Sequence, residues 1–416
     1  MDDNYIVGLD IGSSKIKVAI ASVSEDNSIS IIAHSQEDSD GIRCGNIIHI
    51  EKAVRSIRNA IKKVEELAGV DVQEVVVNIS GRHIEGMLGS GQTALRGNGH
   101  PINRDDIEQV LKQAKAIPNN ADRKLLEVIP QSYSIDGEES IPDPTGMSGV
   151  KLEGRVHLIS AASNTYNNLL NCLNQAQLNV SRILFSGLAS AESVLSDEEK
   201  KMGVALFDIG SGTIDIVAYK DDSVVYSGCI DLGAAKITQD LSYGLHTTPK
   251  AAEHIKRSHG ACYLEESENC EIEVSDAGGR ETRFTTRDVV VNIIQSRMTE
   301  ILEITRKELD NEDVFEHLKA GIILTGGGAN LTYLSELTAD IFNDGLDHAS
   351  EIRVGIGHPK PMDGVDTNQD ASLSTLLGLI KLVVSTQGEN NNPTKKENNS
   401  GFGTIKTLFK TLKDYI

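Results

Sequence analysis

With 416 residues, of which 39% are hydrophobic, the chain is long enough for two to four domains with sizeable cores. Its formal net charge of −21 argues against nucleic acid as a general partner, because most of the surface would repel a polyanion. The five cysteines show no Cys-x-x-Cys spacing and are expected to be reduced cytosolic thiols, in neither a disulfide framework nor a zinc site. Neither a secretory signal nor an apolar run near the ~20 residues of a membrane span is recognisable.

The predicted elements follow the hydrophobic periodicity. Alternating apolar residues around small-residue turns indicate strand hairpins, whereas apolar residues spaced by three and four indicate helices. In chain order, the pattern predicts a hairpin over 5–35, a helix over 47–67 ending at Gly69, a strand over 74–79, a helix over 186–195, a second hairpin over 204–226, helices over 234–243 and 249–257, a hairpin over 271–286, a long helix over 288–309 and a buried strand over 322–328.

Two segments differ in composition from the rest. Residues 84–157 are punctuated by prolines around one predicted helix at 104–116, which indicates a small inserted subdomain. Residues 387–400 are polar and show no periodicity, which indicates a disordered linker.

One short motif occurs twice. Gly8-Leu-Asp-Ile-Gly-Ser-Ser14 and Phe207-Asp-Ile-Gly-Ser-Gly-Thr213 each place an aspartate after an apolar run and before a small-residue turn. Asp10 and Asp208 are 198 positions apart, as are the residues around them, so the chain has two similar halves. Backbone N–H groups can hold phosphates only where side chains do not intrude. Two such turns on opposite sides of a cleft would bind the β- and γ-phosphates from both sides.

These motifs define a candidate nucleotide site. Asp10 and Asp208 could hold the waters of a hydrated Mg²⁺ ion, and Lys15 could offset phosphate charge. A glycine triplet at a strand end would let adenine or ribose lie against bare backbone. One hairpin alone would fit an ordinary turn, and the triplet alone a loop before a helix, but together they favour a nucleotide site. The candidate residues are Asp10, Gly12, Ser13, Ser14, Lys15, Asp208, Gly210, Ser211, Gly212, Thr213, Gly326, Gly327 and Gly328.

Two hairpins followed by a glycine triplet resemble the superfamily of actin, Hsp70 and the sugar kinases. Within it, the sequence most closely resembles the FtsA family of actin-like bacterial cell-division proteins, nearly throughout up to about residue 386. The closer resemblance rests on Gly41-Ile-Arg-Cys-Gly-Asn-Ile47, Asn78-Ile-Ser-Gly-Arg-His-Ile84, Ile102-Asn-Arg-Asp-Asp-Ile107 and Ile141-Pro-Asp-Pro-Thr-Gly-Met-Ser-Gly-Val-Lys-Leu-Glu153.

The resemblance implies an α/β fold with two lobes, actin-like and ribonuclease H-like, and an inserted small α+β subdomain. The expected parts are subdomain 1A (1–83, 158–190 and 371–386), inserted subdomain 1C (84–157), subdomain 2A (191–232 and 322–370), subdomain 2B (233–321), a disordered linker (387–400) and a membrane-targeting amphipathic helix (401–416).

The resemblance also implies further nucleotide contacts. Glu253 and Lys256 match positions that contact ribose or base, and their spacing puts both on one helix face, although a solvated pair is the alternative. At Gly233-Ala234 the family usually has two glycines, so the extra methyl would narrow the approach to the phosphates. Actin-like and Hsp70-like proteins orient the attacking water with Glu or Gln, where this chain has Ser186. Serine is a poor base, so we expect ATP binding with weak or slow hydrolysis.

The last sixteen residues predict an amphipathic helix with one apolar face bordered by lysines. Such a basic helix would lie in the interface of an anionic membrane, and at ~1.5 Å per residue it is too short to cross. A terminal helix docked on its own domain or on a partner is the alternative. The expected membrane-binding residues are Phe402, Ile405, Lys406, Leu408, Phe409, Lys410, Leu412 and Lys413.

The resemblance implies a peripheral protein on the cytoplasmic side of the cell membrane at the division septum. It would polymerise with ATP, bind the C-terminal peptide of the tubulin-like protein FtsZ and recruit later divisome membrane proteins. Arg297 would recognise the peptide, although an ordinary salt bridge is the alternative. Two other functions stay open. A small-molecule kinase would need a catalytic carboxylate and a sugar pocket that the sequence does not reveal, and a type IV pilus assembly protein would lack the basic tail.

Overall fold

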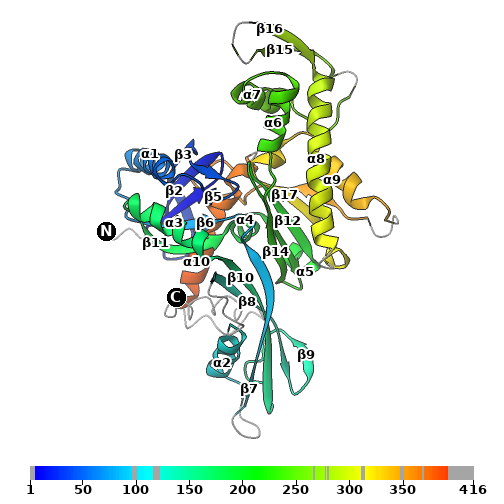
Figure 1. Ribbon diagram of the computed structural model, residues 1–416. Helices are drawn as coiled ribbons and strands as arrows, with labels where there is room; N and C mark the ends of the chain where they lie inside the picture. The colour runs from blue at the N-terminus through cyan, green and yellow to red at the C-terminus, as the bar shows by residue number, and fades with distance from the viewer. Residues whose placement is uncertain are drawn as a thin grey trace.

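The computed structural model describes residues 5–95, 101–115, 122–265, 268–276, 278, 281–310, 314–346, 351–367 and 370–391. Two lobes lie side by side, each built around a five-stranded sheet, and a third part with a four-stranded sheet extends from their junction (Figure 1). The chain passes from lobe 1 to lobe 2 through helix α4 (Ser186–Val194) and returns through helix α10 (Ser374–Asn391). The two-lobed α/β architecture and the inserted subdomain are confirmed.

The sheets of the two lobes have the same topology. In each, three antiparallel strands form a meander, and two further strands lie in parallel beside its first strand. The predicted hairpins are therefore equivalent, and each gains a third strand. In spatial order, lobe 1 has β11 (Asn179–Phe185), β6 (Glu74–Ile79), β1 (Tyr5–Ile11), β2 (Lys15–Val23) and β3 (Ile29–Asp38), and lobe 2 has β14 (Ser223–Ile230), β13 (Ile214–Lys220), β12 (Val204–Ile209), β17 (Gly321–Thr325) and β18 (Val354–Ile356).

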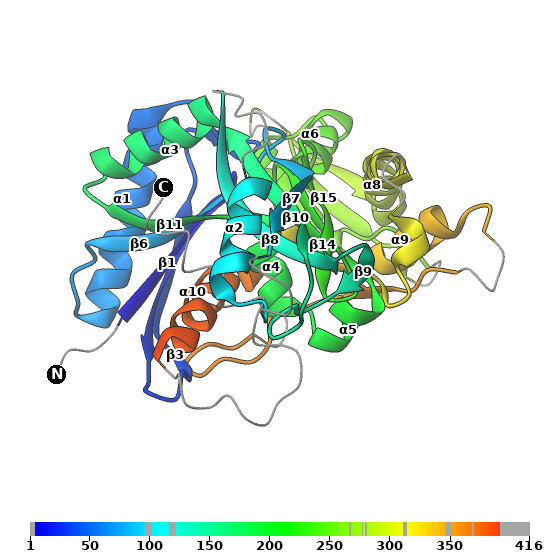
Figure 2. The same ribbon diagram turned by 90° about the horizontal axis from the view of Figure 1, so that it is seen from below.

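Helices cover both faces of the lobe 1 sheet. Helices α1 (Ile50–Ala68) and α3 (Ser163–Gln175) lie on one face and α10 on the other, as Figure 2 shows from below. Helix α1 ends where the sequence predicts, because Gly69 adopts a left-handed conformation (φ 71°) and donates its N–H to the carbonyl of Glu65. The buried apolar side chains described in α10 are Leu376, Leu377, Leu379, Ile380, Val383 and Val384.

The inserted part is a sheet with one helix packed on one face. The helix, α2 (Arg104–Ala114), begins at a capping box in which Asn103 and Asp106 accept each other's backbone N–H groups. The sequence predicts this helix but not the strands, because Pro130 and several glycines interrupt their alternation. In spatial order the strands are β7 (Glu85–Ala94), β10 (Lys151–Ala162), β8 (Arg123–Ile135) and β9 (Glu138–Ile141).

The inserted part contacts both lobes. Toward lobe 2, Nε2 of His157 on β10 lies 2.8 Å from Oγ of Ser227 on β14. Toward lobe 1, Arg182 of β11 forms an ion pair of 3.2 Å with the buried Glu127 of β8. The insertion is therefore fixed across the junction as well as by its two chain connections.

Lobe 2 continues into an outer helical part whose predicted elements are confirmed. The long helix α8 (Arg287–Asp310) lies along the side of the lobe, and the hairpin of β15 (Glu271–Ser275) and β16 (Thr282–Thr286) forms the tip (Figure 1). The two shorter helices are α6 (Ala235–Gly244) and α7 (Pro249–His259). The remaining elements are β4 (Ile42–Arg43), β5 (Asn46–Ile47), α5 (Asp197–Met202), α9 (Leu334–Asn343) and the short 3-10 turns η2 (Phe315–His317), η3 (Gly327–Asn330) and η5 (Ala371–Leu373).

At the C-terminal end, α10 continues to Asn391, beyond residue 387, where the sequence predicts the linker to begin. Within the described ranges, no helix combines the length and apolar character that a bilayer crossing requires. The predicted membrane-binding residues lie outside the described residues; these are Phe402, Ile405, Lys406, Leu408, Phe409, Lys410, Leu412 and Lys413.

Candidate nucleotide-binding site

A cavity of about 570 Å³ lies between the lobes. Both hairpin turns, α4, α7, η3 and the start of α10 contribute to its wall. The residues predicted from the hairpins and the glycine triplet all line it, as do Glu253 and Lys256. Gly233 lies behind the wall instead, where a Cβ would come within 2.6 Å of the carbonyl oxygen of Ser211, and Ala234 takes the lining position.

The two turns have the same geometry and meet at their tips. The N–H of Gly12 donates to the carbonyl of Lys15 (3.0 Å), and the N–H of Gly210 donates to the carbonyl of Thr213 (2.8 Å). A Cβ on Gly212 would lie 2.7 Å from Oγ of Ser13 and 3.0 Å from the backbone of Cys44, so a side chain there would crowd lobe 1. Gly212 is thus needed where the turn of lobe 2 touches lobe 1.

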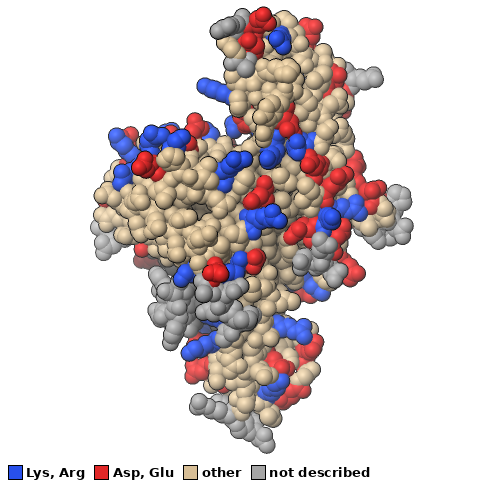
Figure 3. Space-filling model, in the orientation of Figure 1, with Lys and Arg blue, Asp and Glu red and all other residues tan. Residues whose placement is uncertain are grey.

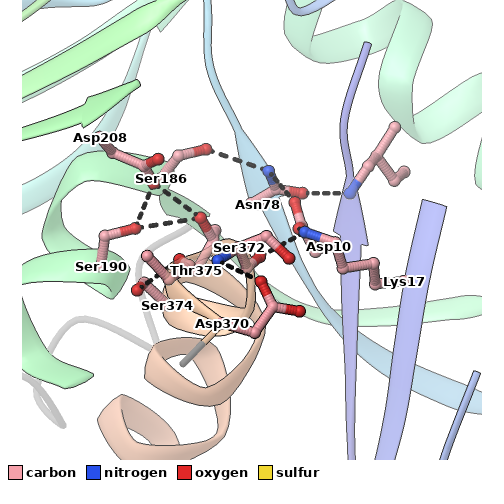
Figure 4. A network of polar contacts seen from close by, with 12 residues as sticks. Asp10, Lys17, Asn78, Ser186, Ser190, Asp208, Asp370, Ser372, Ser374 and Thr375 are labelled. Atoms are coloured by element: carbon pink, nitrogen blue, oxygen red, sulfur yellow. Dashed lines mark hydrogen bonds and ion pairs between the residues drawn. The ribbon is translucent and has the colours of Figure 1, made fainter. Parts of the chain in front are cut away.

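The two predicted aspartates are held by unlike partners (Figure 4). Oδ1 of Asp10 accepts from the amide of Asn78 (3.0 Å), and its Oδ2 lies 3.4 Å from Nζ of Lys17. Oδ2 of Asp208 accepts from the hydroxyls of Ser190 (2.5 Å) and Thr375 (2.9 Å). Burial raises the pKa of both carboxyls, although their hydrogen bonds act in the opposite direction.

The hairpins also differ at the position across from each aspartate. In the strand register, Asp10 pairs with Lys17 and Asp208 pairs with Asp215, so equivalent positions carry opposite charges. Burial and the neighbouring Asp208 raise the pKa of Asp215 to about 8, and both its carboxylate oxygens accept from the Ser80 hydroxyl. The cavity lining includes residues that the sequence motifs did not predict as part of the site, among them Lys17, Asn78, Ser80 and Asp215. The repeat contains a signal for two of them, because Lys17 and Asp215 are also 198 positions apart.

The donor set fits a hydrated Mg²⁺ ion. Asp10 has Lys17 as a direct ion-pair partner, whereas Asp208 lies across from Asp215 and contributes to the raised pKa of that carboxyl. A cation beside them would lower the pKa of both groups. Among the described residues, no three His, Cys, Asp or Glu side chains are grouped closely enough to enclose a metal ion directly.

Basic side chains gather around the cavity of this acidic chain. Lys15, Lys17, Lys256 and Arg257 line it, and Figure 3 shows Lys and Arg side chains along the border between lobe 1 and the outer part of lobe 2. A hydrogen bond and the charge of Lys15 lower the pKa of Asp38, with a further contribution from Arg257. The lining also contains the acidic side chains of Asp10, Asp208, Asp215, Glu253 and Asp370, so the cavity carries charges of both signs.

The glycine triplet has two packing roles and one open position. A Cβ on Gly326 (φ 85°) would come within 2.2 Å of Oδ1 of Asp208, and one on Gly328 within 2.4 Å of Ile209. A Cβ on Gly327 would meet only Ser372, at 3.7 Å. Gly326 and Gly328 are therefore needed for packing against β12, and Gly327 presents its bare backbone to the cavity.

On the opposite wall, Glu253 and Lys256 of α7 form an ion pair of 2.7 Å. Nζ of Lys256 also donates to the hydroxyl of Thr238 (2.9 Å), which in turn donates to Glu253 (2.5 Å). Although burial raises the pKa of Glu253, hydrogen bonds from Lys256 and Thr238 outweigh it and lower the pKa overall. The pair is thus fixed in place toward the cavity.

Ser186 occupies a buried position in the wall. Its Oγ accepts from the amide of Asn78 (3.0 Å) and donates to the carbonyl of Ile79 (3.2 Å). The hydroxyl proton is therefore used within the protein, and the side chain has no carboxylate or amide to orient a water.

Arg297 lies away from the cavity, on α8. Its guanidinium forms ion pairs with Asp240 of α6 and Glu300 of α8. The structure therefore brings Arg297 into the salt bridge that the sequence leaves open as its alternative role, on the outer part of lobe 2.

Two lobes with equivalent strand meanders, joined by two helices around a shared cavity, define the actin-like ATPase fold. The fold resembles a PilM–PilN type IV pilus biogenesis complex (TM-score 0.62, 17% identity, 91% of this chain and 98% of that chain). It also resembles MreB5 of Spiroplasma citri bound to ADP (TM-score 0.56, 13% identity, 94% of this chain and 99% of that chain). At these identities the likeness shows the fold alone.

The chain belongs to the FtsA family of cell division proteins, as the sequence resemblance predicted. The family model described as "Cell division protein FtsA" matches residues 205–378, and "SHS2 domain inserted in FTSA" matches residues 81–160. The chain is 35% identical over 383 residues to the FtsA of Borreliella burgdorferi, covering 91% of each. It is 32% identical over 389 residues to that of Escherichia coli K12, covering 91% of this chain and 90% of the relative.

Proposed function

We propose that the cavity binds ATP with Mg²⁺. The observation that carries this proposal is the contact between two equivalent small-residue turns, one from each lobe, at the cavity wall. Their backbone N–H groups and the hydroxyls of Ser13, Ser14, Ser211 and Thr213 would hold the phosphates, and the waters of the ion would contact Asp10 and Asp208. Bound ATP would stabilise the closed arrangement of the lobes.

Titration with a fluorescent ATP analogue tests this binding. Gly212→Val is expected to abolish it, because the new side chain separates the two turns. Gly355→Ala is the control, since a Cβ there makes an ordinary contact at 3.7 Å and lies outside the cavity lining. If the native chain binds no adenine nucleotide in the presence of Mg²⁺, the proposal is wrong.

Hydrolysis of the bound ATP is proposed to be slow, because Ser186 replaces the water-orienting Glu or Gln and already bonds to Asn78 and Ile79. ATP would then act mainly as a ligand that permits polymerisation. Phosphate release under single-turnover conditions measures the rate. A turnover near the ~10 s⁻¹ typical of metabolic enzymes would contradict this proposal.

The C-terminal segment is proposed to tether the polymer to the cytoplasmic side of the cell membrane at the septum. One short basic amphipathic helix binds weakly, so polymerisation would supply avidity. Sedimentation with anionic liposomes, comparing the full chain with one stopped at Gln387, tests the tether. Replacing Lys406, Lys410 and Lys413 by Glu should abolish binding, whereas replacing them by Arg should preserve it. Electron microscopy on a lipid monolayer with and without ATP then tests assembly.

The outer part of lobe 2 is proposed to bind the C-terminal peptide of FtsZ and thereby connect its filaments to the membrane, where later divisome membrane proteins join. Arg297 would exchange one of its carboxylate partners for a carboxylate of the peptide. Fluorescence anisotropy with the labelled peptide should show weaker binding for Arg297→Ala than for the exposed control Arg283→Ala. Equal affinities of the two variants would exclude Arg297 as a recognition residue.

A further inference from the structure

Ser80 of lobe 1 holds the second hairpin, which belongs to lobe 2. Its buried hydroxyl donates to both carboxylate oxygens of Asp215 (2.7 and 2.8 Å) and lies 3.2 Å from Oγ1 of Thr213. Thr213 and Asp215 both line the cavity, at the turn and on the strand that follows it. A hydroxyl of lobe 1 therefore fixes the lobe 2 side of the candidate phosphate site.

The same stretch of chain also holds the first hairpin, two residues earlier. The side-chain amide of Asn78 donates to Oδ1 of Asp10 (3.0 Å), and its oxygen accepts the N–H of Ile11 (2.6 Å). Like Ser80, Asn78 lines the cavity. The end of strand β6 is therefore in contact with both hairpins, and a change in the separation of the two turns would act on it.

A short connection leads from this point into the inserted part. Four residues separate Ser80 from strand β7 of the inserted sheet. Within them, the N–H of Arg82 donates to Oδ1 of Asp231, which follows β14 in lobe 2 (3.1 Å), and the N–H of Ile84 donates to the carbonyl of Gly81 (2.9 Å). So short and bonded a connection cannot absorb a shift of Ser80 as a long free loop would.

Arg123, the first residue of β8, fixes the far end of this connection to the inserted sheet. Its Nη2 donates to the carbonyl of His83 (2.8 Å), and its Nη1 lies 2.9 Å from Oε1 of Glu85 on β7. Its Nε donates to the hydroxyl of Ser160 on β10 (2.9 Å). A guanidinium can bond to several partners at once because its donors form a planar fork. The segment 78–84 is thus bonded at one end to the candidate nucleotide site and at the other to two strands of the insertion.

We propose that Ser80 is a positioning residue that couples the binding of Mg·ATP to the inserted sheet. Bound phosphates fix the second turn, Asp215 and Thr213 fix Ser80, and the connection with Arg123 then fixes β7. Because coupling between two sites is reciprocal, a ligand that holds the inserted sheet in this position raises the affinity for Mg·ATP by the same factor. This inference rests on the proposed nucleotide binding.

The test measures amide hydrogen exchange at residues 85–90 as the ratio of rates without and with saturating Mg·ATP. Mg·ATP is expected to slow exchange there about fivefold or more in the native chain and not in Ser80→Ala. Ser35→Ala is the matched control, because Ser35 is a similarly buried serine of lobe 1 whose hydroxyl donates to the carbonyl of Ala60 (2.8 Å), outside the cavity lining. It should keep the native ratio. A general loss of stability would speed exchange in both states and leave the ratio unchanged.

A second variant acts at the far end of the connection, outside the cavity lining. Arg123→Met removes the bonds to His83, Glu85 and Ser160 and is expected to abolish the exchange response at residues 85–90. Its affinity for a fluorescent ATP analogue should stay within about twofold of the native value, whereas Ser80→Ala should bind about tenfold more weakly because Asp215 loses a charge-assisted hydrogen bond. Arg155→Met is the control, since Arg155 of β10 is 67% exposed and pairs with Glu139 instead.

The inference is wrong if Ser80→Ala keeps the native exchange ratio, or if Arg123→Met responds to Mg·ATP as Arg155→Met does. If Ser80→Ala cannot be saturated with Mg·ATP, the comparison of Arg123→Met with Arg155→Met decides. A native chain that binds Mg·ATP without any change in exchange at residues 85–90 would also overturn the inference, and would leave the proposed function intact. A native chain that binds no Mg·ATP would overturn both.

Discussion

Gly378 of α10 lies against the backbone of Ala189 of α4, where a Cβ would come within 1.7 Å of the carbonyl oxygen. The two helices that join the lobes are therefore in direct backbone contact. A side chain added at residue 378 could be accommodated only if the two helices moved apart, because a backbone carbonyl oxygen cannot rotate away as the end of a long side chain can.

Gly378→Ala is accordingly expected to destabilise the protein by about 3 kcal/mol or more, because overpacking forces the helices apart. The gain of about 1 kcal/mol in helix propensity from Gly to Ala has the opposite sign and is smaller. Denaturant unfolding of Gly378→Ala beside Gly355→Ala measures the difference. Equal midpoints for the two variants would show that the junction tolerates a wider separation.

A second prediction concerns His157, which is buried between the inserted sheet and β14. Burial lowers its pKa to about 4, and within the described part of the chain its Nδ1 has no hydrogen-bond partner. In the unfolded state the pKa of His157 is ~6.5. Between about pH 4 and pH 6.5 the unfolded state therefore binds more protons than the folded state. The contribution of His157 to stability is complete above this pH range and is lost as the pH falls through it. Between about pH 7.5 and pH 5, this loss amounts to about 2 kcal/mol.

His157→Gln removes the titrating group and is expected to flatten this part of the pH dependence. Denaturant unfolding at both pH values for the native chain, His157→Gln and the exposed control His34→Gln measures the effect. The control should keep the native slope. A native slope in His157→Gln would mean that other groups cause the acid sensitivity.

The lobe topology was predictable because the chain repeats one pattern. The aspartate, the small turn and the alternating strand occur twice, and the register places Asp10 and Asp208 at equivalent strand positions. The glycine triplet and the α7 pair also line the cavity as expected. Local pattern suffices for such features, since each depends on a few adjacent residues.

The missed residues lie where elements distant in sequence meet. Asn78 lies one residue before the end of β6, and Thr375 is the second residue of α10. Nothing in their neighbours indicates that they reach Asp10 and Asp208. Lys17 and Asp215 were within the repeat, but their opposite charges hid the correspondence. The strands of the insertion were missed because Pro130 interrupts the alternation in β8, a strand that pairs on both sides.

A third prediction concerns the ion pair that fixes the insertion to lobe 1. Glu127 is 4% exposed, and Arg182 lies 3.2 Å away. Arg182→Met would leave a carboxylate buried without its cation and is expected to cost about 3–5 kcal/mol. Replacing both residues, as Glu127→Leu with Arg182→Met, should recover most of that loss, because no charge remains buried.

Unfolding of the two single variants and the double variant gives the coupling energy of this pair. The surface pair of Lys62 and Glu66, with side chains 77% and 67% exposed, is the control and should show almost no coupling. Additive effects at residues 127 and 182 would mean that water reaches Glu127 once Arg182 is removed.

The last prediction separates the two lysines of the first hairpin. Nζ of Lys17 lies 3.4 Å from the buried Asp10 and also donates to Ser372, whereas Lys15 pairs with Asp38, whose side chain is 90% exposed. Solvent screens the ion pair between Lys15 and Asp38, so removing the Lys15 charge has little effect on the stability of the protein. Removing the Lys17 charge leaves the buried carboxylate of Asp10 without its ion-pair partner. Lys17→Met is therefore expected to weaken Mg·ATP binding about tenfold or more, and Lys15→Met by less. Titration with a fluorescent ATP analogue ranks the two variants, and a larger loss for Lys15→Met would place the phosphate charge at the mouth of the cavity instead of beside Asp10.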